Sequence, residues 1–189
     1  YYPAAPDINY EVRDIDKSMA DNITVAYYLI PPIDAIKDNY IYVNVNRSDY
    51  DPAKLYPTLA HEGYPGHMLQ TTYYKSICKY PIRQVMNFLG YAEGWAMYAE
   101  MSSYQLADLD SQCEGLSSLC QINDQLNYGL SCRSDIGINY EGWTKEDLGS
   151  YLDKYGMNDS DTVDALYQGA IDNPGVYLSY YYGWLQMWN

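Results

Sequence analysis

The sequence predicts a mainly α-helical fold with a small β element at its N-terminal end. Two observations support this prediction. Two segments within the first fifty residues alternate or concentrate β-branched and aromatic residues, whereas apolar residues recur at helical spacing from Leu55 onward. No repeat or composition break marks a second domain. We therefore expect the 189 residues to form one domain, with residues 1–50 as a β-rich edge segment and residues 51–189 as a helical part.

Two segments of the N-terminal part are expected to be strands. They are Asn9–Asp14 and Tyr40–Val45, where β-branched and aromatic residues alternate or gather. Pro31-Pro32 and Asp38-Asn39 supply the breaks between them. This pattern fits a small sheet or ribbon, and Tyr40–Val45 is a candidate edge strand for an extended partner chain.

The helical part divides into seven expected helices. Pro65 and Gly66 separate the first two, because proline breaks a helix. Thr144 begins the fifth as an N-cap followed by acidic residues, and Gly156 ends that helix. The expected spans are 57–64, 66–80, 92–109, 112–132, 145–155, 160–171 and 175–187.

The charge of the chain narrows the classes of partner. Asp and Glu number 25 against 11 Lys and Arg, which gives a net charge of −14, and the cations are scattered along the chain. Binding to phosphates needs a basic surface, so the sequence argues against a nucleic-acid partner. No stretch reaches the roughly 18 apolar residues of a membrane span, so none is expected.

The residues that suggest chemistry concentrate in one string, HEGYPGH, which contains both histidines of the chain, His61 and His67. Imidazole is a common zinc ligand, and two scarce histidines beside Glu62 suggest a metal site. In the H-E-x-x-H arrangement of zinc peptidases, a four-residue helical step returns the second histidine to the face of the first. Here the step is six residues.

On an unbroken helix, six residues turn about 600°, and His67 would point about 120° away from His61. Pro65 interrupts that helix, because it lacks an N–H and clashes with the carbonyl four residues earlier. Gly66 can adopt backbone angles closed to other residues. A bulge or restart here would return His67 to the metal-facing side, so the spacing permits a zinc site without proving one.

A second acidic string, YAEGWAMYAE at residues 91–100, supplies a candidate third ligand, Glu93. Glu100, seven residues on, returns to the same helical face and is expected to accept a hydrogen bond from a ligand histidine. Two imidazoles, one carboxylate and a water make a catalytic zinc sphere with an open position. Zn²⁺ is therefore the expected cofactor.

Each of these residues also has an ordinary structural interpretation. His61 and His67 would then be buried histidines, Glu93 an acid that stabilises a helix start, and Glu100 a surface or ion-paired residue. The combination favours the metal site, because it meets the ligand type and number that zinc demands.

The string AHEGYPGHMLQ at residues 60–70 resembles the H-E-x-x-P-G-H-x-x-Q signature of a bacterial family, domain of unknown function 885, whose members look like zinc metallopeptidases of the gluzincin type. Three further strings are similar to the family's motifs and occur in the same order. They are YAEGWAMYAE at 91–100, RSDIGINYEGWTKED at 133–147 and PGVYLSYYYGWLQM at 174–187.

This resemblance implies a zincin-like helical catalytic domain and a zinc-dependent hydrolase of peptides or proteins. It implies that His61, His67 and Glu93 hold the metal and that Glu62 is the general base. Family members are several hundred residues long, so the chain is expected to match their C-terminal half and to associate with a missing N-terminal region. Together with the acidic, tyrosine-rich composition, the resemblance favours an extracytoplasmic or secreted location.

The resemblance also implies supporting residues. Tyr180 and Arg133 are the expected donors to the oxyanion of peptide hydrolysis, since a phenol or guanidinium can donate without moving far. Asp135 and Asn139 are expected to contact the ligand residues and to orient them without binding the metal. The family commonly has histidine at the place of Asn139, and an amide cannot carry a positive charge. This departure bears on activity more than on fold.

Two alternatives stay open. A catalytically inactive binding module on the same scaffold would account for Asn139. A glycosidase that uses paired carboxylates would account for the acidic, tyrosine-rich composition, but it leaves the histidine string unexplained.

Overall fold

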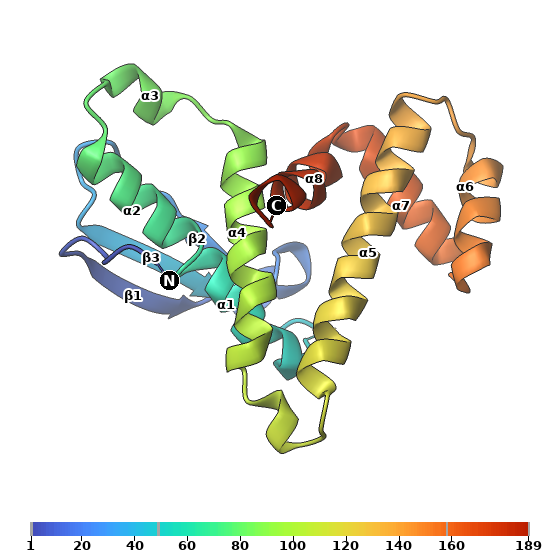
Figure 1. The fold of residues 1–189 in the computed structure, drawn as a ribbon, viewed down its shortest axis with the longest axis horizontal. Helices are drawn as coiled ribbons and strands as arrows, with labels where there is room; N and C mark the ends of the chain where they lie inside the picture. Colours follow the sequence, from blue (N-terminus) through green and yellow to red (C-terminus); the bar gives the residue numbers. More distant parts are fainter. Residues whose placement is uncertain (1, 49, 158, 189) are drawn as a thin grey trace. The chain divides into compact units, whose positions relative to one another are not determined.

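The computed structural model describes residues 2–48, 50–157 and 159–188, and Figure 1 shows its elements. These residues form two compact units. The first unit comprises residues 1–88 and 95–118, and the second comprises residues 89–94 and 119–189. The predicted class, mainly α with a small β element, is confirmed. The expectation of a single domain stays a prediction.

The first unit contains a three-stranded sheet of order β1-β3-β2. Its strands are β1 (Asn9–Asp14), β2 (Ala26–Leu29) and β3 (Asp38–Val43). A 3-10 helix, η1 (Lys17–Asn22), follows β1. β1 runs parallel to β3 with Val12 opposite Ile41, and β2 runs antiparallel to β3 with Tyr28 opposite Ile41.

The two predicted strands exist as β1 and β3, but the predicted edge is wrong. β3 lies in the centre of the sheet, where β1 and β2 occupy both of its sides. The missed strand, β2, has only four residues, too few for an alternating pattern to stand out. It forms an edge of the sheet in place of β3.

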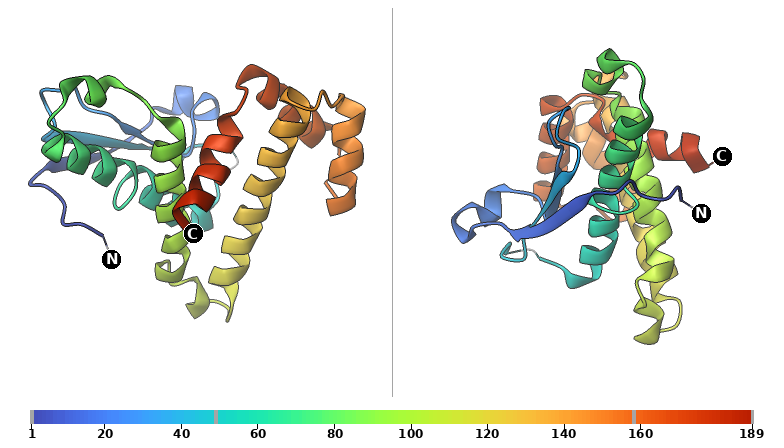
Figure 2. Two further views of the ribbon diagram at one scale, coloured as in Figure 1. Left: turned by 45° about the horizontal axis from the view of Figure 1, so that its top comes forward. Right: turned by 90° about the vertical axis from the view of Figure 1, so that its left-hand side faces the viewer.

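Two helices, α1 (Pro52–Glu62) and α2 (His67–Ile77), cover one face of this sheet (Figures 1 and 2). The alternation of β3 turns Ile41 and Val43 toward the helices. Together with Tyr28 and Met68 they form a buried cluster, against which Leu55 and Leu59 of α1 pack. The sheet therefore packs against the two helices that carry the HEGYPGH string.

The chain then continues through α3 (Pro81–Val85) into α4 (Leu89–Ser103), which begins in the second unit and continues in the first. Two short 3-10 turns, η2 (Tyr104–Leu106) and η3 (Leu109–Ser111), follow it. α4 is the predicted helix 92–109, which ends at Ser103 because the chain tightens into η2 there, and the left-handed Asp108 (φ 51°) separates η2 from η3. The short α3 was not predicted.

The remaining elements are α5 (Leu116–Asn139), α6 (Lys145–Leu152), η4 (Asp153–Tyr155), α7 (Ser160–Asp172) and α8 (Val176–Trp188). The helices α6 and α7 lie side by side (Figure 1). Leu148 and Leu152 of α6 pack on Val163 of α7 in a buried cluster of the second unit. The predicted cap is present, since Thr144 and Asp147 form a capping box. Gly156 ends η4 at φ +74°. Among the described residues, no helix has both the length and the apolar character needed to cross a membrane.

Candidate metal centre

The break in the HEGYPGH string is where the sequence places it. α1 ends at Glu62 and α2 begins at His67. Gly66 turns the chain so closely against α1 that a Cβ there would lie 1.8 Å from the carbonyl oxygen of His61. No other residue fits without moving the backbone. The Tyr64–Pro65 peptide bond in this turn is cis.

The restart brings the two imidazoles together. Their ring centroids lie 4.8 Å apart with the rings at 83°. The ligand-type atoms of His61, Glu62 and His67 all lie within 4.8 Å of one another. His61 is buried and the other two side chains are half-buried. The predicted return of His67 to the side of His61 is confirmed.

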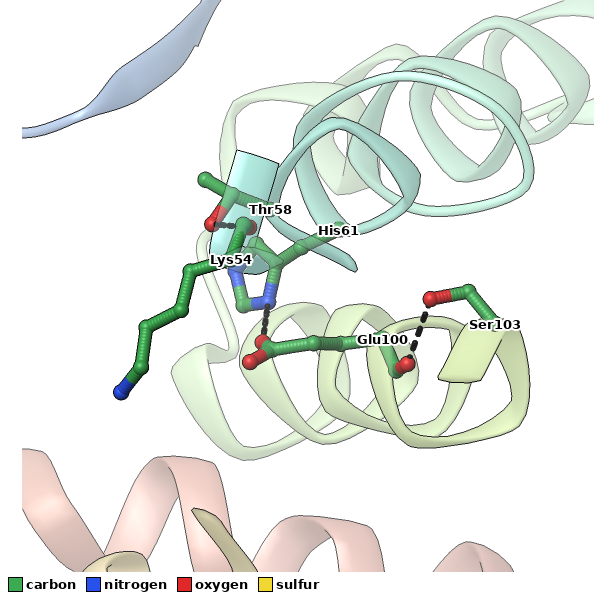
Figure 3. Close-up of polar contacts among 5 residues, drawn as sticks. All are labelled: Lys54, Thr58, His61, Glu100 and Ser103. Atoms are coloured by element: carbon green, nitrogen blue, oxygen red, sulfur yellow. Dashed lines mark hydrogen bonds and ion pairs between the residues drawn. The ribbon is translucent and has the colours of Figure 1, made fainter. Parts of the chain in front are cut away.

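His61 is oriented by Glu100 from α4 (Figure 3). Its Nδ1 lies 2.8 Å from Oε2 of Glu100, and both side chains are buried. A carboxylate can only accept, so Nδ1 carries the proton and Nε2 presents a lone pair. The Ser103 hydroxyl donates to the backbone carbonyl of Glu100 at 2.7 Å, so it does not compete for the carboxylate. The predicted hydrogen bond between Glu100 and a histidine of the HEGYPGH string is present.

Glu62 is held by the edge of the sheet. The backbone N–H of Tyr28 donates to Oε2 of Glu62 at 2.8 Å. This amide points away from β3, which places the outer edge of β2 at the HEGYPGH string. The Tyr28 side chain turns inward, where its hydroxyl donates to Oδ1 of Asn39 at 2.6 Å and burial raises the pKa of the phenol.

The predicted third ligand, Glu93, lies near the beginning of α4 and is half-buried. It belongs to the second unit, whereas both histidines belong to the first. Its role as a ligand therefore stays a prediction.

Asp135 and Asn139 join three helices of the second unit. Asp135 is 1% exposed and accepts from the N–H groups of Gly175 at 3.0 Å and Tyr177 at 3.3 Å, at the start of α8. Asn139 donates to Asp135 at 2.8 Å and to the carbonyl of Ala170 in α7 at 2.9 Å. The pair thus ties α5 to α7 and α8. Its support of the metal ligands stays a prediction.

The two predicted oxyanion donors also lie in the second unit. Arg133 bonds Glu141 at 2.9 Å and stands over the ring of Trp143 at 4.4 Å. The ring of Tyr180 is parallel to that of Tyr128 within 11°, with centroids 6.0 Å apart. These contacts describe the surroundings of the two side chains, and their catalytic roles stay predictions.

Two groups at the site were missed from the sequence. The Tyr28 amide is a backbone group, which leaves no mark in a sequence. Trp95 of α4 donates its indole N–H to the carbonyl of Pro65 at 2.8 Å. Its position in the YAEGWAMYAE string, between Glu93 and Glu100, was the available signal.

A crystal structure described as the "putative lipoprotein" from Colwellia psychrerythraea has a similar fold. The two superpose with a TM-score of 0.77 and are 24% identical, over 99% of this chain and 32% of that chain. This chain therefore spans about a third of the length of that protein. No curated protein matches this chain.

The family comparison is broader. The sequence profile of the family described as bacterial protein of unknown function, DUF885, matches residues 1–189. This match covers the whole chain, including the HEGYPGH and YAEGWAMYAE strings that carry the resemblance. The chain therefore belongs to the bacterial DUF885 family.

Proposed function

We propose that this chain carries the metal centre of a zinc-dependent peptide hydrolase. The observation that supports the proposal most is the convergence of His61, Glu62 and His67 at a broken helix, with their ligand-type atoms within 4.8 Å of one another. Two imidazoles that can share one metal ion, with a glutamate beside them that can serve as the base, are typical of zinc peptidases.

The donor set suits zinc in chemistry and spacing. Two ligand atoms on one tetrahedral zinc ion lie about 3.4 Å apart, given zinc–nitrogen bonds near 2.0–2.1 Å. Small side-chain rotations close the remaining separation. The hydrogen bond that Nδ1 of His61 donates to Glu100 supports the choice of Nε2 as the metal-binding nitrogen.

We assign Glu93 as the third protein ligand. Glu93 and Glu100 are seven residues apart on α4, a rotation of about 700°, so they share one face of that helix. Glu62 is less suited to be a ligand, because the Tyr28 amide already holds one of its oxygens.

Bound zinc would supply an activated water and polarise the scissile carbonyl. Glu62 would serve as the general base that accepts a proton from the attacking water and passes it to the leaving amine. The Tyr28 N–H holds Oε2 of Glu62 and so fixes the direction of the carboxylate beside the two imidazoles. Tyr180 and Arg133 are proposed donors to the developing oxyanion.

The edge of β2 suggests how a substrate binds. An extended peptide laid along this edge would form backbone hydrogen bonds beside Glu62, without a strict demand on side chains. Peptides or proteins are therefore the proposed substrates. Because the Colwellia protein is described as a lipoprotein, we place the reaction outside the cytoplasm.

The test has two steps. Zinc titration followed by calorimetry is expected to show one tightly bound ion per chain. Glu62→Gln is then expected to retain zinc and to lose hydrolysis of a mixed peptide library by about 10²–10⁴-fold. Glu146→Gln, an exposed acid in the first turn of α6, is the matched control and retains both properties.

The outcomes separate the alternatives. A chain that takes up no zinc would contradict the metal centre. Zinc binding without any hydrolysis by the wild-type protein would favour a binding module on the same scaffold. Hydrolysis of glycosides that is insensitive to chelation would favour the glycosidase.

A further inference from the structure

We propose that Trp95 is a positioning residue that holds His67 beside His61 through the Pro65–Gly66 peptide group. The inference rests on the proposed function, in which the two imidazoles bind one metal ion. It assigns to α4 a second task besides holding His61 through Glu100.

The Pro65–Gly66 peptide group is held at both of its ends. Its carbonyl oxygen accepts from the indole N–H of Trp95 at 2.8 Å. Its N–H donates to the carbonyl of Ala60 in α1 at 2.9 Å. A peptide group is planar, so two bonds in opposite directions fix its orientation between α1 and α4.

This peptide group sets the direction of His67. His67 is the first residue of α2 and follows Gly66 directly. The side of the break toward α1 is already closed, because a Cβ on Gly66 would meet the His61 carbonyl. Beyond His67, the buried Met68 and Leu69 anchor α2. The Trp95 bond is thus the contact that closes the turn from the α4 side.

Trp95 is itself fixed in place. Its ring stacks on Tyr98 with centroids 6.0 Å apart and planes at 28°, and it meets the edge of Tyr2 at 6.0 Å. Trp95 and Glu100 both belong to α4. One helix therefore holds both imidazoles, His61 by a direct hydrogen bond and His67 through the turn that precedes it.

The test removes the indole N–H while keeping an aromatic ring. Trp95→Phe is expected to weaken Zn²⁺ affinity by about 10- to 100-fold, the usual loss when a group that orients a ligand is removed. Bound Co²⁺ is expected to show an altered ligand-field spectrum. The matched control is Trp184→Phe, because the indole N–H of Trp184 has no hydrogen-bond partner among the described residues.

A second variant covers the case in which Trp95→Phe folds poorly. Replacement of Trp95 by benzothienylalanine keeps the bicyclic ring and exchanges only the N–H for sulfur. The same loss of affinity is expected for this variant, with the circular dichroism spectrum of the wild type.

A metal-free measurement keeps this inference separate from the proposed function. The Gly66 amide is expected to exchange its hydrogen about fivefold faster in the metal-free Trp95 variants, since one hydrogen bond of the turn is lost. If the wild type binds no zinc, the proposed function fails while this readout still tests the turn. Unchanged exchange at Gly66, or zinc affinity within twofold of the wild type, would overturn the role of Trp95.

Discussion

Glu100 in the first unit and Asp135 in the second are both buried carboxylates, 7% and 1% exposed, yet their hydrogen-bond donors differ in kind. Glu100 accepts from the imidazole of His61. Asp135 accepts from two backbone N–H groups and the amide of Asn139. Burial alone therefore does not separate a structural acid from one that serves a site.

The two carboxylates differ in the groups to which their hydrogen-bond donors connect them. The donors around Asp135 end in the backbone of α7 and α8, so the network is closed within the fold. The partner of Glu100 is an imidazole whose ring lies beside a second histidine and a carboxylate. A buried carboxylate that orients an imidazole, rather than backbone amides, marks the candidate site.

The largest expected effect separates these two regions by metal binding. His67→Ala should lower zinc affinity by more than about 100-fold, because loss of a ligand costs more than loss of the group behind it. Asp135→Ala should lower zinc affinity far less than His67→Ala does and should lower the free energy of unfolding by about 3 kcal/mol, because three hydrogen bonds to a buried group are lost. Calorimetric titration and urea unfolding measure the two quantities.

The same two variants can also show that the two carboxylates do not differ in role. A clear fall in zinc affinity in Asp135→Ala, with the fold intact by circular dichroism, would show that Asp135 supports the ligands as the sequence suggested. The two carboxylates would then serve one site.

Two glycines give the next effect, since each marks a close approach in one of the regions. Gly66→Ala should destabilise the chain by more than about 3 kcal/mol and weaken zinc binding, because the new Cβ would meet backbone oxygens of Ala60 and His61. Gly137→Ala should cost about 1–3 kcal/mol, because the atoms that it meets belong to the Trp143 ring and can move. Equal losses in urea unfolding would contradict this distinction.

A substitution at Asn139 is expected to have a smaller effect, and it tests the hydrogen bonds around Asp135. Its amide donates to both Asp135 and Ala170, whereas a neutral imidazole has one N–H. Asn139→His should therefore lower the melting temperature by about 3 °C at pH 8. The loss should shrink toward pH 5.5, because a histidine facing Asp135 gains a proton and a second donor. A loss that does not vary with pH would show that packing decides the difference.

The sequence predicted the parts of the fold that rest on local signals. The N-cap at Thr144, the helix end at Gly156 and the strand at Asn9–Asp14 were all recognised from residue type and spacing. β2 was missed because its four residues form a strand through pairing with β3. The edge was then assigned to the wrong strand, because strand order depends on contacts between distant residues.

The candidate site divides in the same way. The helix break at Pro65-Gly66 follows from residue type, and the bond from His61 to Glu100 was anticipated because Glu100 shares a helical face with Glu93. The Tyr28 amide and the Trp95 bond to Pro65 depend on how separate elements pack. Periodicity along one segment carries no information about such contacts.

The smallest expected effect extends the comparison to exposed carboxylates that, like Asp135, accept from backbone amides. Asp159 caps α7 by accepting from the Thr162 N–H at 2.8 Å, and this bond lowers the pKa of its carboxyl. A lowered pKa contributes stability above the unfolded value near 3.8, and this contribution is lost as the pH falls through the folded value.

Asp159→Asn keeps a capping side chain without the charge, so its melting temperature should fall less than that of the wild type between pH 5 and pH 3, by a few degrees at most. Because the cap lies on α7, zinc affinity at neutral pH should stay unchanged. Parallel pH profiles of the two proteins would show that this charge contributes nothing to the fold.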